Sequence, residues 1–448
     1  MKYKNETRSS ILDNYNNFSD EKKSDDYCNQ LSYEYAHNVI INFKNDFNEF
    51  DLEEKFKILS RLLLITNKYD RNLSEMFFEY DIPELLIQIV TNLPMTKIEG
   101  DISNNVFLII SNILNSSDNE FEELLINNSF VSICYEYVIC NISKNSVLTC
   151  ISQLSENKEY CKIISERFSP TMLINIYAND NYFKECPLII MNYITNKIYS
   201  SNVVCECLKN ILPILNPLHY DYLLYAISIF ISDNSLLAEL TCLKEIEAFL
   251  KQTINMKNTD NLIRTVNILS LFYSEDNCQI DFDINKVMKL IYYKNMKLNI
   301  ECLNLLQNFV DCEQRASLLI ENNIFDLINE MICFGTYSQK YHNSLLLINV
   351  IIHCNKSMVK PYIFKFNVIS NILSTIGFCY VESNITPFLF DSLLKISSVL
   401  ETTEEINNFI QLINNSEFYD FVKFIESKGE RYENEKCIID WINNINII

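Results

Sequence analysis

Side chains that can donate and accept hydrogen bonds occur repeatedly near the C-terminal end of the long apolar segments of this chain. Six of them are carboxamides, and three more segments carry a serine at the same place; these nine positions, called the markers below, are Asn67, Asn112, Gln153, Asn192, Ser228, Ser270, Asn308, Asn349 and Ser398. A carboxamide has both a donor and an acceptor. The markers are therefore suited to binding rather than to bond cleavage.

Catalytic chemistry is not indicated elsewhere. The four histidines stand alone, without Cys, Glu or a second His at metal-ligand spacing; they are His37, His219, His342 and His353. The four glycines are too far apart for a nucleophile elbow, a dinucleotide fingerprint or a phosphate loop. Carboxylate pairs are unavoidable at this composition and carry no weight without a pocket. We expect no enzyme, no cofactor and no metal site.

The charge balance limits the partners. The formal net charge is -21, which argues against a nucleic-acid scaffold, because such a protein needs Lys and Arg to neutralise phosphates. The same charge suits a basic protein partner. It is equally compatible with a solvated acidic surface that has no special partner.

Cysteine use and hydropathy indicate a compartment. The sixteen cysteines are scattered and form no CxxC pair, which is typical of reduced, buried thiols. The first thirty residues lack the apolar core of a signal peptide. The most apolar run, from Tyr222 to Ile231, is far shorter than the ~20 residues of a membrane span. We expect a cytoplasmic or nuclear protein that does not enter the membrane.

The elements that would position the markers are helices. Only 4 Gly and 8 Pro occur in 448 residues, too few for the turns of a large sheet protein. The predicted organisation is a disordered tail over 1–30, a capping helix within 31–54, repeats over 55–430 and a closing helix within 431–448. Predicted helices include Tyr33–Phe50 and Glu433–Ile445, and Gly429 is expected to end a helix in a left-handed conformation.

Residues 301–332 show the repeating unit most clearly. At about 100° per residue, one face of the first helix collects six apolar side chains, which are Cys302, Leu303, Leu305, Leu306, Phe309 and Val310. Successive markers lie 36 to 49 residues apart, clustering near 41. That period, with two or three helices per unit, is typical of armadillo or HEAT solenoids, in which each unit buries its apolar face against its neighbours.

Two stretches carry a family resemblance: LLLITNKYDRNLSEMFFEYDIPELLIQIV and LLQNFVDCEQRASLLIENNIFDLINEMI. Their pattern resembles the armadillo-repeat family, which includes importin-α and β-catenin, over roughly residues 55–430. The resemblance implies an all-α solenoid, a right-handed superhelix of about nine repeats. The family's usual Gly before the long-helix pair is replaced by Asp81, Ser129 or Asn323, and the Trp-x-x-x-Asn array of importin-α is absent.

The resemblance also implies a binding groove. The third helix of each armadillo repeat lines the concave face, so the marker carboxamides would pair with the main chain of an extended peptide. Carboxylates one or two turns away would form an acidic rim for a Lys/Arg-rich segment, namely Asp70, Glu156, Glu185, Asp221, Glu301, Asp311, Asp391 and Glu401. They could also be ordinary solvated residues of amphipathic helices.

The expected function is that of a monomeric, non-catalytic scaffold or adaptor that binds an extended, basic protein segment. The alternative is a divergent nuclear-import adaptor of the importin-α kind; the missing Trp array and the lack of a basic N-terminal cluster count against it. Replacing Asn112, Asn308 and Asn349 by Ala is expected to weaken binding with little effect on stability.

Overall fold

The computed structural model describes residues 33–67, 71–96, 99–115, 119–179, 183–233, 240–274, 280–429 and 432–445. Within these ranges the regular secondary structure is entirely helical, and no strand occurs, which confirms the predicted all-α class. The tail predicted over 1–30 lies outside the described residues. None of the helices described is long and apolar enough to cross a membrane.

The chain divides into two compact units, Met1–Ala226 and Ile227–Ile448. Helix α14 (Tyr220–Ser232) contains the division.

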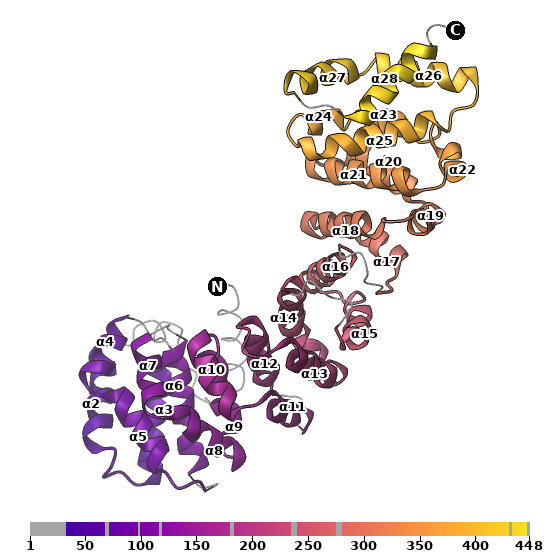
Figure 1. The fold of residues 1–448 in the computed structure, drawn as a ribbon. Coiled ribbons are helices and arrows are strands. Elements are labelled where there is room, and N and C mark those ends of the chain that lie inside the picture. The colour runs from indigo at the N-terminus through magenta and orange to yellow at the C-terminus, as the bar shows by residue number, and fades with distance from the viewer. Residues whose placement is uncertain are drawn as a thin grey trace, which may run out of the picture. The chain divides into compact units, whose positions relative to one another are not determined.

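Unit 1 alternates a longer helix with two further helices along the chain, and Figure 1 colours them from indigo to dark magenta. Its helices are α2 (Tyr33–Asp46), α3 (Leu52–Thr66), α4 (Arg71–Glu79), α5 (Ile82–Asn92), α6 (Gly100–Leu114), α7 (Asn119–Asn127), α8 (Phe130–Ile139), α9 (Lys144–Leu154), α10 (Lys158–Arg167), α11 (Pro170–Asn179), α12 (Glu185–Thr195), α13 (Ser201–Ile211), η3 (Leu212–Ile214) and η4 (Pro217–His219).

Unit 2 is less regular, with a single described helix between α16 and α18 and two between α18 and α21, and it runs to the yellow C-terminal helices of Figure 1. Its helices are α15 (Leu243–Thr253), α16 (Thr259–Tyr273), α17 (Ile284–Leu290), α18 (Met296–Phe309), α19 (Glu313–Glu321), α20 (Ile324–Phe334), α21 (Tyr337–His353), α22 (Lys356–Val359), η6 (Lys360–Tyr362), α23 (Val368–Leu373), α24 (Ile376–Cys379), η7 (Ser383–Ile385), α25 (Thr386–Ser397), α26 (Thr403–Asn414), α27 (Phe418–Ser427) and α28 (Glu433–Ile445).

The helices that carry the markers pack against one another in sequence. In unit 1 the order is α3, α6, α9 and α12, and in unit 2 it is α16, α18, α21 and α25, with the closing helix α28, which carries no marker, packed against α25. All six residues predicted for the apolar face of α18 are buried, and Leu306 is fully so. The cores of both units are thus built from consecutive helices of this stack, as the period of the sequence predicted.

Left-handed residues other than glycine stand directly before several of the helices. Asp81, Ser129 and Asn323 have φ of 51°, 58° and 62° and immediately precede α5, α8 and α20. Asn and Asp enter this region more readily than most residues, because their short polar side chains can hydrogen-bond locally. Each of these helices is therefore preceded by a left-handed residue that is not glycine.

Some boundaries differ from the predictions. Helix α2 ends at Asp46 rather than at Phe50, because Asp51 and Glu54 form a capping box that starts α3 at Leu52. Residues 363–376 do not form one helix, because Asn367 has φ of 51° and α23 begins only at Val368. The predicted helix Glu433–Ile445 and the left-handed Gly429, with φ of 77°, are confirmed.

Candidate functional site

The first marker amide joins α6 to α3. Nδ2 of Asn112 donates to Oγ1 of Thr66 at 3.2 Å and to Oδ1 of Asn67 at 3.0 Å. Asn67 itself is exposed and caps the end of α3. The amide nitrogen of Asn112 is therefore committed to the preceding helix, while its oxygen accepts no hydrogen bond from the described residues.

The next amides lie between α9 and α12. Asn192 is only 4% exposed, and its Nδ2 donates to Oγ of Ser155 at 2.8 Å and to the carbonyl of Ser152 at 3.4 Å. Gln153 on α9 is half-buried, and no donor in the described ranges reaches its enclosed Oε1. Asn192 is thus part of the core of unit 1 rather than of an open surface.

Unit 2 repeats the arrangement with half-buried amides. Nδ2 of Asn308 on α18 donates to Oγ and O of Ser270 on α16, at 2.9 and 3.2 Å. Nδ2 of Asn349 on α21 donates to the carbonyl of Gln307 at 3.4 Å. The side chain of Gln307 in turn donates to the carbonyl of His342 at 2.5 Å.

A common rule governs these contacts, which we call rungs. In each rung the amide nitrogen on one long helix donates to side-chain or backbone oxygens at the C-terminal end of the long helix before it. The rungs at Asn112, Asn308 and Asn349 therefore hold neighbouring helices together. We now expect a stability cost on their removal, in contrast to the expectation from sequence. The amide oxygens of these residues are still able to accept hydrogen bonds from a ligand.

Glu185 lies inside unit 1, not on a rim. It begins α12, is 4% exposed, and accepts a hydrogen bond from Oγ1 of Thr149 at 3.3 Å. Its Oε2 is buried without a donor in the part of the chain that the structure describes. Burial raises the pKa of Glu185, and the nearby charge of Lys184 and the hydroxyl of Thr149 partly oppose the rise.

Other proposed rim carboxylates are engaged within the chain. Asp311 pairs with Arg315 at 2.6 Å, and Glu401 pairs with Lys360 at 2.5 Å. Glu301 is half-buried and accepts from Nδ2 of Asn267 at 3.4 Å. Asp391 accepts a hydrogen bond from Asn434. The structure does not gather these groups into one acidic site.

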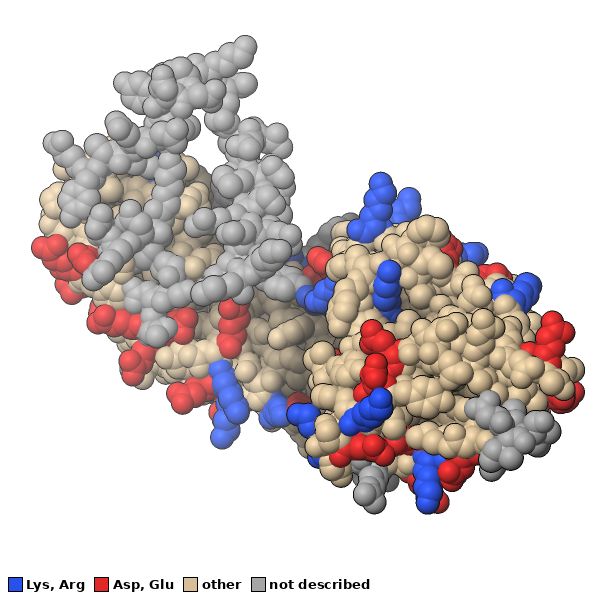
Figure 2. Space-filling view, turned by 90° about the horizontal axis from the view of Figure 1, so that it is seen from above, with Lys and Arg blue, Asp and Glu red and all other residues tan. Residues whose placement is uncertain are grey.

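The remaining rim residues are dispersed. Glu156 is exposed just after α9, and Asp221 is half-buried in the first turn of α14. Asp70 lies outside the described residues. On the face seen in Figure 2, acidic and basic side chains are interspersed and leave broad uncharged areas between them.

The histidines and cysteines occupy structural positions. His219 is buried and shares a hydrogen bond with the hydroxyl of Tyr177 at 3.0 Å; burial and then the charge of Lys184 lower the pKa of His219. Among the described cysteines, those exposed are Cys140, Cys312, Cys333 and Cys437. No cluster of three or more His, Cys, Asp or Glu able to hold a metal occurs in the ranges described.

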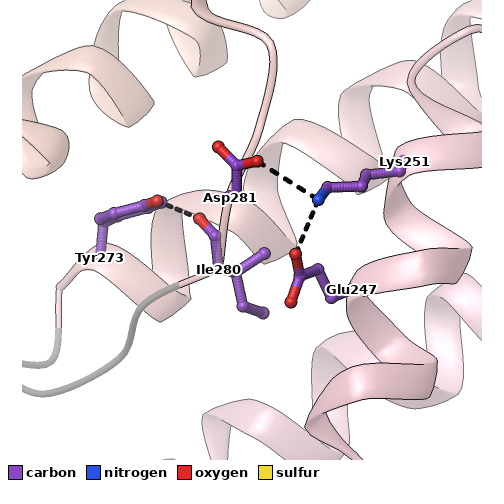
Figure 3. A network of polar contacts seen from close by, with 5 residues as sticks. All are labelled: Glu247, Lys251, Tyr273, Ile280 and Asp281. Atoms are coloured by element: carbon purple, nitrogen blue, oxygen red, sulfur yellow. Dashed lines mark hydrogen bonds and ion pairs between the residues drawn. The ribbon is translucent and has the colours of Figure 1, made fainter. Parts of the chain in front are cut away.

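A cavity of about 280 Å³ lies in unit 2, beside the end of α15 and residues 281–283. At its edge Lys251 pairs with Oε1 of Glu247 at 2.7 Å and with Oδ2 of Asp281 at 3.3 Å, as Figure 3 shows. The hydroxyl of Tyr273 donates to the carbonyl of Ile280 in the same view. A single lysine is thus shared between two carboxylates at this cavity, and exposed pairs of this kind contribute little to stability.

No family model matches the chain. No curated protein matches it either. Among solved structures, the chain is similar to an engineered protein whose crystal structure came from the Northeast Structural Genomics Consortium: the TM-score is 0.62, the identity 10%, and the match covers 89% of this chain and 95% of the other. A likeness at this identity concerns the fold alone.

The sequence did not point to a set of aromatic and acidic residues in unit 2. The hydroxyl of Tyr292 donates to Oε2 of Glu330 at 3.0 Å, and that of Tyr341 donates to Glu382. Phe334 and Tyr337 are strongly exposed beside them. The available signal was the spacing of the two pairs, 38 and 41 residues, which lies near the repeat period.

Proposed function

We propose that this chain is a non-catalytic interaction scaffold that binds an extended, basic segment of another protein, in the cytoplasm or nucleus. On this proposal its helices form armadillo/HEAT-type repeats, about nine in a right-handed superhelix. The succession of one long helix and two further helices supports the repeat type, as do the left-handed residues Asp81, Ser129 and Asn323.

The observation that carries the proposal is the orientation of the rung amides. The preceding helix holds the nitrogens of Asn112, Asn308 and Asn349, which fixes each carboxamide plane. An oxygen held in this way can accept an N–H from a ligand main chain without losing further side-chain entropy. Each such bond is worth roughly 0.5 to 1.5 kcal/mol net, so binding requires several of them together.

The test is a titration with a fluorescein-labelled peptide of six Arg-Ser pairs, followed by anisotropy at fixed ionic strength. The variant N112A/N308A/N349A removes three acceptor oxygens, and we expect binding about tenfold weaker from the loss of several hydrogen bonds.

The matched control is T66V/S270A, which removes one of the two hydrogen bonds in each of two rungs and retains the amide oxygens of Asn112 and Asn308. The bonds to Oδ1 of Asn67 and to the carbonyl of Ser270 remain and keep the amides oriented. We expect this control to retain affinity. Equal loss in both variants would mean that the rungs act only by holding the helices together, and unchanged binding in the triple variant would exclude the amides as the site. Adding importin-β to the peptide-bound protein tests the import-adaptor alternative directly.

A further inference from the structure

Two tyrosine–carboxylate pairs lie on successive parts of unit 2. Tyr292, just after α17, donates to Glu330 on α20, and Tyr341 on α21 donates to Glu382 after α24. Both carboxylates are exposed, and in the described chain neither forms an ion pair with Lys or Arg. The chain's own cations neutralise other acids, such as Asp311, but leave these two negative.

Exposed rings connect the two pairs. Phe334 follows Glu330 by one turn at the end of α20, and Tyr337 begins α21 two residues after Gly335; their exposed fractions are 88% and 70%. The ring of Tyr337 packs edge-on against Phe378, with centroids 5.0 Å apart. We call Tyr292, Glu330, Phe334, Tyr337, Tyr341 and Glu382 the aromatic edge.

A tight turn projects these rings outward. A Cβ added to Gly335 would lie 2.3 Å from the carbonyl oxygen of Met331, a distance that no side chain could adopt without moving the backbone. Glycine is therefore required where α20 gives way to α21. The rings of Phe334 and Tyr337 flank this turn and remain largely exposed, although one edge of Tyr337 meets Phe378.

Exposed rings next to unneutralised carboxylates form a site for cations. A guanidinium over an aromatic face gains about 0.5 to 1 kcal/mol at exposed positions, and a carboxylate alongside can accept its hydrogen bonds. The chain contains an internal example: Arg315 lies 5.0 Å from the ring centroid of Tyr273 while it pairs with Asp311 at 2.6 Å. The aromatic edge offers the same two partners without the arginine.

We propose that the aromatic edge binds arginine side chains of an extended segment of another protein, with guanidinium groups stacked on the exposed rings and paired with Glu330 and Glu382. Arginine is favoured over lysine because its planar group stacks on rings and binds carboxylates through two donors. This surface is separate from the rungs: Asn349 follows Tyr341 by eight residues, about 12 Å along α21. The inference therefore does not depend on the amide oxygens.

The experiment uses the full chain and three peptides of equal length, built from six Arg-Ser, Lys-Ser or Glu-Ser pairs. The ring variant is F334A/Y337A and the charge variant is E330Q/E382Q. The matched control is E321Q/E404Q, which removes the same charge from exposed positions elsewhere in unit 2. Circular dichroism verifies folding, and F334A alone serves if the double variant is unstable.

We expect the ring variant to bind the Arg peptide about tenfold more weakly, from the loss of two stacking surfaces. The charge variant should lose about two- to fivefold, because exposed pairs are weak, and the control should change less than either. The Arg peptide should bind several-fold more tightly than the Lys peptide, and this preference should vanish in the ring variant.

Equal losses in the control and the charge variant would show attraction to net charge only, and would overturn the proposal. So would an unchanged affinity in the ring variant. Loss of self-association in the ring variant, measured by sedimentation velocity without peptide, would identify a second copy of the chain as the occupant instead. Loss of binding in N112A/N308A/N349A with intact binding in the edge variants would place the peptide on the rungs and reject the edge.

Discussion

Asn192 in unit 1 and Asn308 in unit 2 occupy the same place near the end of a long helix, and both donate to a serine hydroxyl on the long helix before, at 2.8 and 2.9 Å. Their surroundings differ. Asn192 is buried, and α12 also buries Glu185, whereas Asn308 and the Glu301 of its helix are half-buried. A marker position therefore fixes the bond to the neighbouring helix but does not decide whether the residue can meet a ligand.

The two rungs can be compared only if the apolar cores of the two units are equally well packed. Leu148 on α9 and Leu306 on α18 are both fully buried, so Leu148→Ala and Leu306→Ala should each lower the free energy of unfolding by about 2 to 5 kcal/mol. Urea denaturation followed by circular dichroism measures both. A cost below 1 kcal/mol at either site would show that one core is loosely packed and that the two rungs are not comparable.

Asn192→Ala tests the buried rung. It removes a donor to the hydroxyl of Ser155 and the carbonyl of Ser152, which still hydrogen-bond to each other at 2.7 Å. The lost bonds and the cavity left at a buried side chain should together cost about 1 to 3 kcal/mol. The same denaturation experiment measures the loss. Ser155→Ala removes the other side of the main hydrogen bond and should couple with Asn192→Ala in a double-mutant cycle; strictly additive losses would contradict the rung.

Asn308→Ala tests the half-buried rung and should cost less, about 0.5 to 1.5 kcal/mol, because water can replace the lost partner. Thermal denaturation of the two alanine variants side by side gives the comparison directly. If Asn308→Ala costs as much as Asn192→Ala, then burial does not distinguish the two rungs, and the contrast between the units fails.

The pH dependence of stability gives the finest test. Burial raises the pKa of Glu185 in the folded protein, so the folded state holds the proton more tightly than the unfolded chain. Glu185 therefore contributes favourably to the free energy of unfolding at pH values below its pKa in the unfolded chain. This contribution is lost as the pH rises through its pKa in the folded protein. Glu185→Gln should remove this fall, so that the variant gains stability relative to wild type from acid to neutral pH.

The companion variant for Glu185 has the opposite sign. The hydroxyl of Thr149 lowers the pKa of Glu185 through its hydrogen bond, so Thr149→Val should make the loss of stability with rising pH steeper. Urea titrations at a series of pH values measure both variants. Parallel pH profiles for wild type and Glu185→Gln would show that the carboxylate is solvated.

The helical period of the sequence predicted the fold well because it identifies the apolar side chains that share one face of a helix. It placed the core of α18 and the closing helix α28 correctly. The left-handed turn at Gly429 was also predicted, from a glycine that follows the last turn of a helix. Local pattern and local geometry coincide at these places.

The helical period could not predict the hydrogen-bond partners of the polar residues that border the apolar face of each helix. The partner of Asn112 or Asn308 lies 38 to 46 residues earlier in the chain, and whether it is reached depends on the offset between stacked helices. Glu185 looks like any acidic residue at a helix start, where the dipole favours it; its burial arises from neighbouring helices. The pairing of Tyr292 with Glu330 is equally non-local.

The left-handed residues also affect the unfolded chain. Asp81, Ser129, Asn323 and Asn367 each accept a conformation that glycine would adopt without strain. A residue with a Cβ explores fewer conformations than glycine in the unfolded chain. Each of these residues therefore adds backbone strain to the native state but reduces the entropy lost on folding. Replacing one of these residues by glycine would remove the strain but increase the entropy lost on folding. The sign of the change in the free energy of unfolding would show which of the two effects is larger.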